Sequence, residues 1–447
     1  MTQEKDLTQG NIYKKLFKLA LPIMGTSFVQ MAYNMTDMIW VGKLGSPAVA
    51  AVGTAGFFTW LAMAFIVIPK ISAEVGVAQA IGKGDMDEGR VYIRHSIQLV
   101  VLFAALYALG LIVFRSNLVS FFNLGDLKIE SDARTYLLII AIGLIFYFIN
   151  PVFSAIFNGS GDSKTPFLIN SVGLIVNIVL DPVLILGFGP IPRMEVAGAA
   201  IATIISQAIV TAIFIYKMKD HKDLFGGLKL FKPLDMNYTK KIIKLGLPVA
   251  VQSGFFTIIA MGMARIIAQW GTTPIAVQKV GSQIEAISWM TAGGFETAMS
   301  TFTGQNYGAN KMKRVRKGYF AGVSIVSVIG IFATLLLIFA ARPIFSIFIQ
   351  EEQAILYGID YLQILGASQL FMCIEITTAG AFNGLGKTMP PSIVGIVFNA
   401  IRIPLAIILS TTSLGLNGVW WAITITSILK GLILSIWYMG TVPTSPQ

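Results

Sequence analysis

The stretch KKLFKLALP, residues 14–22, returns nearly unchanged as KKIIKLGLP, residues 240–248. Three more pairs of segments follow in the same order, at nearly the same distance along the chain. They are GSPAVAAV (45–52) with GTTPIAVQKV (271–280), AQAIGKGD (78–85) with GQNYGANK (304–311), and FNGSGDSKTP (157–166) with FNGLGKTMPP (382–391). Four pairs in one order predict that the chain contains two copies of one structural unit.

The composition is that of an integral membrane protein. Of the 447 residues, 55% are hydrophobic and 12% charged, and the mean hydropathy is +0.74. Soluble domains are about 45–50% apolar and about 25% charged. The first apolar run follows a polar segment and ends without a small-residue cleavage site, so we interpret it as a retained helix and not a signal peptide.

Twelve apolar runs, bounded by Gly, Pro and charged residues, predict twelve transmembrane helices. The fold class expected is therefore all-α, with two pseudo-symmetric six-helix bundles. The predicted domains are an N-terminal bundle (1–216), a linker (217–241) and a C-terminal bundle (242–447). The approximate spans are 16–41, 47–80, 91–114, 131–157, 166–187, 196–216, 242–268, 274–304, 318–340, 354–382, 389–409 and 417–439.

The distribution of basic residues predicts the orientation in the membrane. The N-terminus and the even-numbered connections carry 22 Lys and Arg residues, whereas the other side carries 5. By the positive-inside rule, both termini face the cytoplasm of a prokaryotic cell. Because the basic residues are confined to short connections, the net charge of +11 reflects topology and does not indicate a nucleic-acid partner.

Cysteine, histidine and motif content argue against a metal site and against an intramembrane enzyme. Cys373 is the single cysteine, which excludes an internal disulfide, and His95 and His221 are the two histidines. The H-E-x-x-H pattern of metalloproteases and the clustered aspartates that hold Mg²⁺-pyrophosphate are both missing from the sequence. We expect no cofactor and no enzymatic activity.

Two aspartates, Asp37 and Asp181, are the sharpest cases of a charged residue inside a predicted span. MAYNMTDMIW (31–40) carries Asp37, with Tyr33 and Asn34 four and three positions before it, and NIVLDP (177–182) places Asn177 four positions before Asp181. Residues three or four apart share a helix face, and a carboxylate inside a bilayer is costly and marks a functional site. Since both acids lie toward the outer ends of their spans, we expect one shared pocket in which a proton and a cationic substrate compete.

At these motifs the chain resembles the multidrug and toxic compound extrusion (MATE) family, and most closely its DinF-type prokaryotic branch. The resemblance covers nearly the whole chain, through KLALP, the turns that close the second and eighth spans, the two FNGxG segments and NIVLDP. It implies export of organic, mostly cationic compounds in exchange for H⁺, or alternatively Na⁺, by alternating access. The matching cation or proton coupling residues are Asp37, Asp181, Asn177, Tyr33, Asn34 and Thr203.

The substrate surface is expected to include Met31, Tyr33, Asn34, Asp37, Asn150, Phe153 and Asn177. A coupling Na⁺ would be held by Asp37, Asn177, Asp181 and Thr203. The structural alternative is that Asp37 is capped by neighbouring hydroxyls near the interface, and that Tyr33 and Asn177 make helix-packing hydrogen bonds.

The second copy does not keep the two acids. Ile403 stands opposite Asp181, and Arg402 is adjacent to it. Glu285, Glu375 and Arg402 are secondary site candidates, with an internal ion pair between Glu285 and Arg402 as the simplest interpretation. The seventh span contains no acid, which argues against a Na⁺ site in the second half and favours proton coupling.

A flippase and a channel are the two transport functions that stand as alternatives to drug export. A lipid-linked oligosaccharide flippase would need a basic cavity for pyrophosphate, whereas the first-half candidates here are acidic. A channel lacks support because a narrow filter motif is missing, while the two-fold repeat suits rocking bundles. We expect a monomer whose partners are small organic cations and membrane lipid.

Overall fold

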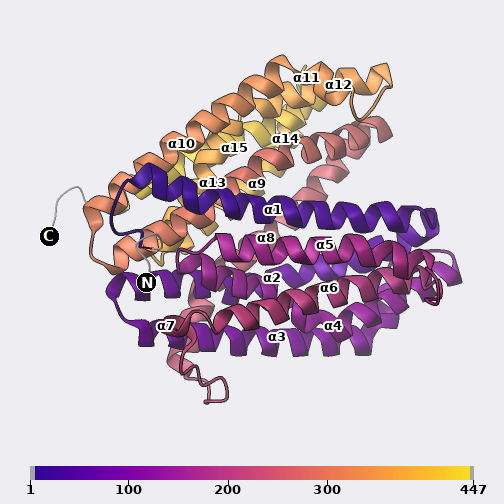
Figure 1. The fold of residues 1–447 in the computed structure, drawn as a ribbon. Helices are drawn as coiled ribbons and strands as arrows, with labels where there is room; N and C mark the ends of the chain where they lie inside the picture. The colour runs from indigo at the N-terminus through magenta and orange to yellow at the C-terminus, as the bar shows by residue number, and fades with distance from the viewer. Residues whose placement is uncertain (1–5, 443–447) are drawn as a thin grey trace. The chain divides into compact units, whose positions relative to one another are not determined.

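The computed structural model describes residues 6–442, which form helices and short connections (Figure 1). Within that range the extended structure is limited to one isolated bridge, between Phe188 and Ile191. The first six long helices correspond to the N-terminal copy. They are α1 (Ile12–Gly42), α2 (Ser46–Lys83), α3 (Met86–Ser120), α4 (Leu127–Gly159), α5 (Lys164–Leu186) and α6 (Glu195–Met218).

The C-terminal copy has the same sequence of helices, after a linker that contains the short α7 (Lys222–Phe225). Its tenth span is broken into two helices that meet at 48°. The elements are α8 (Met236–Ile267), η1 (Ala268–Trp270), α9 (Thr272–Gly308), α10 (Met312–Phe339), α11 (Ala341–Phe345), α12 (Glu352–Gly366), α13 (Gln369–Gly384), α14 (Met389–Ser410) and α15 (Leu416–Thr441). Every predicted span is confirmed as helical, and 354–382 is broken between α12 and α13.

Length and hydropathy alone identify fewer spans than the repeat does. Among the residues described, nine helices are apolar and long enough to cross a bilayer, or ten if α12 and α13 count as one. Helices α1 and α9 are not in that group. Helix α1 carries the polar stretch around Asp37, so its low hydropathy and its candidate site have the same cause.

The chain divides into two compact units whose boundaries differ from the predicted domains. Among the described residues, the first unit contains Asp6 and residues 25–246, and the second contains residues 7–24 and 247–442. The predicted N-terminal bundle, 1–216, includes the first half of α1, whereas in the structure this half packs with the second copy. The predicted linker, in turn, belongs to the first unit together with the start of α8.

Specific contacts hold these two helix beginnings in their units. In the second unit, the Leu7 N–H donates to Gln305 Oε1 at 3.1 Å, and the Phe17 ring meets Phe295 edge-on at 5.9 Å. In the first unit, the Ser72 hydroxyl donates to the Ile242 carbonyl at 2.8 Å. The two segments involved are the repeated KKLFKLALP and KKIIKLGLP, so the two units exchange equivalent pieces of chain.

The FNGxG segments make the same turn in both units. A Cβ on Gly159 would lie 2.5 Å from the Glu74 carbonyl oxygen, and one on Gly384 would lie 2.4 Å from that of Ser300. The second glycine of each segment has a positive φ, +84° at Gly161 and +75° at Gly386, where glycine is favoured. Close backbone approach and turn geometry thus explain why both copies share this motif.

Candidate functional site

The two intramembrane aspartates lie at matching levels of the first unit. Asp37 is five residues before the end of α1, and Asp181 is five residues before the end of α5. These helices run in the same direction in the chain, each from the end that carries the basic connections. The two carboxyl groups are neighbours in the structure, and the Asn177 amide lies beside both of them. The two acids that were expected to share a pocket therefore lie next to each other in the structure.

Two polar side chains donate to these carboxylates. The Asn177 Nδ2 group donates to Asp181 Oδ1 at 3.0 Å, along the same face of α5. From α6, the Thr203 hydroxyl donates to Asp37 Oδ2 at 3.4 Å. We call Asp37, Asn177, Asp181 and Thr203 the acidic cluster. It joins three helices of one unit.

The acidic cluster is rich in acceptors that have no donor. Asp181 and Asn177 are fully buried, with 0% of each residue exposed. Asp37 Oδ1, Asn177 Oδ1 and Asp181 Oδ2 are buried oxygens that lack a hydrogen-bond partner. Buried polar atoms are normally paired, so three orphaned oxygens around two carboxyl groups indicate a place for a bound proton or cation.

Two tyrosines border the acidic cluster. Tyr33 is 6% exposed and donates its hydroxyl to the Thr203 carbonyl at 3.3 Å. Tyr136 of α4 lies close to Asp37 and Asp181 and is 8% exposed. Tyr136 was not among the site residues predicted from the sequence. Like Tyr33, it is a tyrosine within an apolar run, and this pattern could have identified it as a site candidate.

Several predicted site residues lie outside the acidic cluster. Asn34 is exposed, unlike Tyr33, so the two side chains do not share the buried face that the spacing predicted. Asn150 is buried and bonded within α4 and α6, donating to Gln207 Oε1 at 2.8 Å and accepting from Thr211 at 2.7 Å. Its amide is therefore satisfied by helix packing.

The apolar members of the predicted substrate surface differ in their burial. Phe153 is 3% exposed and packs on Phe214 with ring centroids 5.7 Å apart, in the core of the first unit. At that position the Phe153 side chain is covered by the core and is not exposed to a ligand in this structure. Met31 of α1 is half-buried.

The second unit holds buried charges of both signs. Lys430 Nζ lies 2.9 Å from Glu375 Oε2, and each side chain is 10% exposed. Arg402 donates to Thr426 Oγ1 at 2.9 Å and to Ser427 Oγ at 3.0 Å. Glu285 neighbours Arg402 and the Tyr361 hydroxyl. The predicted Glu285 and Arg402 proximity is present, but the close ion pair is the one between Glu375 and Lys430.

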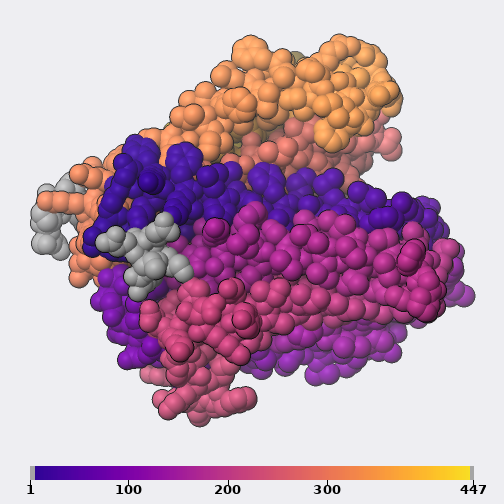
Figure 2. Space-filling view, viewed as in Figure 1, coloured from indigo at the N-terminus to yellow at the C-terminus, as the bar shows by residue number. Residues whose placement is uncertain are grey.

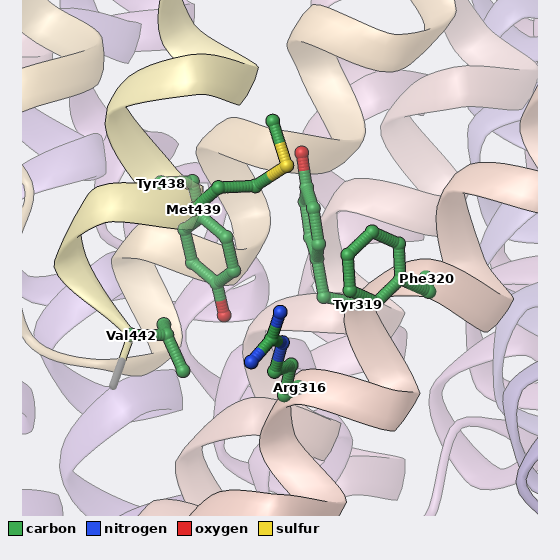
Figure 3. Close-up of a pocket in the computed structure, with 6 residues that line it drawn as sticks. All are labelled: Arg316, Tyr319, Phe320, Tyr438, Met439 and Val442. Carbon is green, nitrogen blue, oxygen red and sulfur yellow. The ribbon is translucent and has the colours of Figure 1, made fainter. Parts of the chain in front are cut away.

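A small pocket in the second unit differs in chemistry from the acidic cluster. It lies between α10 and α15, and the Tyr438 hydroxyl points toward the Arg316 guanidinium (Figure 3). Tyr319, Phe320, Met439 and Val442 complete its lining. Because it contains no acid, we assign it no part in cation binding.

The fold and the acidic cluster define a class of protein. Repeated helical units with acids inside the span region are typical of membrane transporters, and the chain is a multi-pass membrane protein. The MatE family model matches residues 22–183 and again residues 248–408. The chain therefore belongs to the MatE family of transporters, with one match in each copy.

Individual relatives cover nearly the full length. The chain is 29% identical over 435 residues to the probable multidrug resistance protein NorM of Thermotoga maritima, covering 96% of this chain and 92% of the relative. It is 23% identical to a FAD transporter of Shewanella oneidensis, covering 97% and 95%. Among solved structures, the outward-facing conformation of a multidrug resistance MATE family transporter matches with a TM-score of 0.89 at 24% identity, covering 99% and 98%.

Proposed function

We propose that this protein is a multidrug efflux transporter that exports organic cations in exchange for H⁺, by alternately exposing its binding site to the two sides of the membrane. The observation that carries the proposal is the acidic cluster, with two carboxyl groups side by side and orphaned oxygens on both. The names of the curated relatives, probable multidrug resistance proteins among them, support the substrate class.

Charge balance gives the proposed coupling its physical basis. Two adjacent ionised carboxylates inside a bilayer repel each other and have lost their hydration, so the pair favours taking up one positive charge. A proton or an organic cation can supply that charge, and the two compete because either one neutralises the pair. Protonation from outside would then release the drug, and deprotonation inside would restore affinity for the next one.

The second unit supports H⁺ over Na⁺ as the coupling ion. Glu375 already has a cationic partner, since the Lys430 ammonium lies 2.9 Å away. A Na⁺ ion would have to displace that ammonium, which is held in a buried pair. Proton exchange at the acidic cluster of the first unit requires no such displacement. If Na⁺ does couple, Asp37, Asn177, Asp181 and Thr203 are the oxygen ligands that the first unit offers.

Membrane placement follows the basic residues. We propose that the end carrying the basic connections and both termini faces the cytoplasm, and that the protein lies in the plasma membrane of a prokaryote. The bacterial relatives support this location. Each copy has its own hydrophobic core, and we propose that the protein works as a monomer.

The coupling ion is tested in proteoliposomes in which H⁺ and Na⁺ gradients are imposed separately. We expect ethidium movement to follow a pH gradient in Na⁺-free buffer and to stop when a protonophore collapses that gradient. Transport that needs Na⁺ and ignores the pH gradient would overturn proton coupling.

The sign of the substrate charge is a separate question, because one relative is named a FAD transporter and flavin nucleotides are anions. The acidic cluster favours cations, as anions would be repelled by it. Ethidium and FAD should therefore be compared as competing substrates in the same vesicles. Inhibition of ethidium transport by excess FAD, together with FAD movement, would favour an anion exporter instead.

A further inference from the structure

The linker between α6 and α8 carries exposed apolar side chains, and together with the adjoining ends of these two helices it forms a strongly basic segment. Residues 217–244 contain eight lysines and three aspartates, a net charge of +5. At the centre of this segment Phe231 is fully exposed, at 103%, while Leu230 and Leu234 are 39% and 40% exposed. We call residues 229–234 the linker tip. Transfer of this ring from water into an apolar environment would be favourable.

The linker tip is held in a defined conformation. The Lys232 N–H donates to the Lys229 carbonyl at 3.2 Å, which closes a turn with Leu230 and Phe231 at its apex. The amide of Gln98, from α3, donates to the carbonyls of Leu230 and Lys232 at 2.6 and 2.7 Å. Since these two carbonyls flank Phe231, one side chain fixes the backbone that presents the ring outward.

Both ends of the linker are also fastened to α3. The Asp235 N–H donates to His95 Nε2 at 2.9 Å, so that Nδ1 of this imidazole carries the proton and donates to the Val91 carbonyl at 2.8 Å. At the other end, Arg90 Nη2 donates to the Asp223 carbonyl at 2.9 Å. The linker therefore follows the side of α3 over more than two helical turns.

The contact with Gln98 also sets the depth of the linker tip. Gln98 is the last strongly polar residue of α3 before the run 99–114, in which Tyr107 is the single polar side chain. This pattern predicts that bilayer hydrocarbon begins beyond Gln98. The linker projects sideways from α3, across the direction of the long helices (Figure 1), and forms a separate lobe on the surface (Figure 2). Phe231 is thus presented at the boundary between headgroups and acyl chains.

We propose that the linker tip is a membrane anchor, in which Leu230 and Phe231 enter the acyl region of the surrounding leaflet and lysines bind anionic phospholipid headgroups. The lysines beside the apolar residues are Lys229 and Lys232, both exposed. An aromatic and a leucine enter the interface while flanking lysines meet phosphate groups, a combination that binds anionic bilayers. The occupant of this surface is the lipid next to the protein's own spans.

The depth of the linker tip is measured with a spin label. Phe231→Cys is introduced into the Cys373→Ala background, labelled with a nitroxide, and reconstituted in vesicles of equal parts phosphatidylethanolamine and phosphatidylglycerol. The matched control is Asp87→Cys. The Asp87 side chain is 89% exposed and lies in the first turn of α3, before the apolar part of that helix. We expect the label at 231 to be more accessible to oxygen than to a water-soluble nickel complex, and the label at 87 to show the reverse.

Three results would overturn the anchor. A label at 231 as open to nickel as the label at 87 would place the linker tip in water. A label immobilised and shielded from both reagents would indicate a protein contact, such as a second copy of this chain. Equal depth in phosphatidylcholine vesicles, or after Lys229→Gln with Lys232→Gln, would exclude the headgroup contribution; we expect the label to move toward water in both cases.

Discussion

The two units have equivalent helices but differ in how their buried charges are paired. Asn177 and Pro182 of α5 correspond to Asn399 and Pro404 of α14, and both asparagines are buried with an orphaned Oδ1. Where α5 has Asp181, α14 has Ile403. The first unit gathers acids that have no basic partner in the cluster, whereas the second pairs Glu375 with Lys430.

The presence or absence of a basic partner distinguishes an acid that can bind a proton or a cation from an acid whose charge is already compensated. A buried acid that already has a cationic side chain has little to gain from a proton or a cation that arrives and leaves. A pair of acids without such a side chain must obtain positive charge from outside the protein. We therefore propose that coupling takes place in the first unit and that the buried charges of the second have a structural role.

The largest effect is expected where the compensated pair is broken. Lys430→Met leaves the Glu375 carboxylate buried without its partner, and loss of one member of a buried pair costs about 3–5 kcal/mol. We expect a large fall in thermal stability in detergent. The double variant Lys430→Met with Glu375→Leu should regain wild-type stability and transport. A double variant that folds but no longer couples to the pH gradient would refute the structural role.

In the acidic cluster, neutralising an acid should affect transport more than folding. Asp37→Asn or Asp181→Asn removes the group that exchanges the positive charge, and charge-assisted interactions of about 1.5–3 kcal/mol correspond to a loss of up to about 100-fold. We expect pH-driven ethidium export in everted vesicles to fall accordingly while the protein still inserts at normal levels. Full activity of both variants would exclude coupling at this cluster.

The backbone that the two units share can be tested at equivalent glycines. Gly159→Ala and Gly384→Ala each force a Cβ against a carbonyl oxygen, at 2.5 and 2.4 Å, and overpacking of this kind costs about 1–3 kcal/mol. We expect similar losses of thermal stability from both. Gly53→Ala is the control, because a Cβ there meets nothing within 4 Å and alanine is the better helix former. Unequal losses would mean that the FNGxG turn has different roles in the two units.

The helices and the two acids were predictable because each depends on local sequence. Apolar run length, repeated turns and the cost of a buried carboxylate all act within one segment. Which segment packs with which unit was not predictable: residues 7–24 pack with the second copy. The packing partners of Asn150 and Phe153 were not predictable for the same reason, since Gln207 and Phe214 lie on another helix.

The smallest predicted effect distinguishes Tyr33 from Asn34, two neighbouring residues that were both predicted to belong to the coupling site. Tyr33→Phe removes the hydroxyl that donates to the Thr203 carbonyl at 3.3 Å, beside the acidic cluster. A hydrogen bond of this kind is worth about 0.5–1.5 kcal/mol, so proton release on ethidium binding should weaken by about 2- to 10-fold. Asn34→Ala should leave proton release unchanged, because that side chain is exposed and lies outside the cluster. Proton release that responds to Asn34→Ala but not to Tyr33→Phe would reverse this assignment and extend the coupling site to the exposed face of α1.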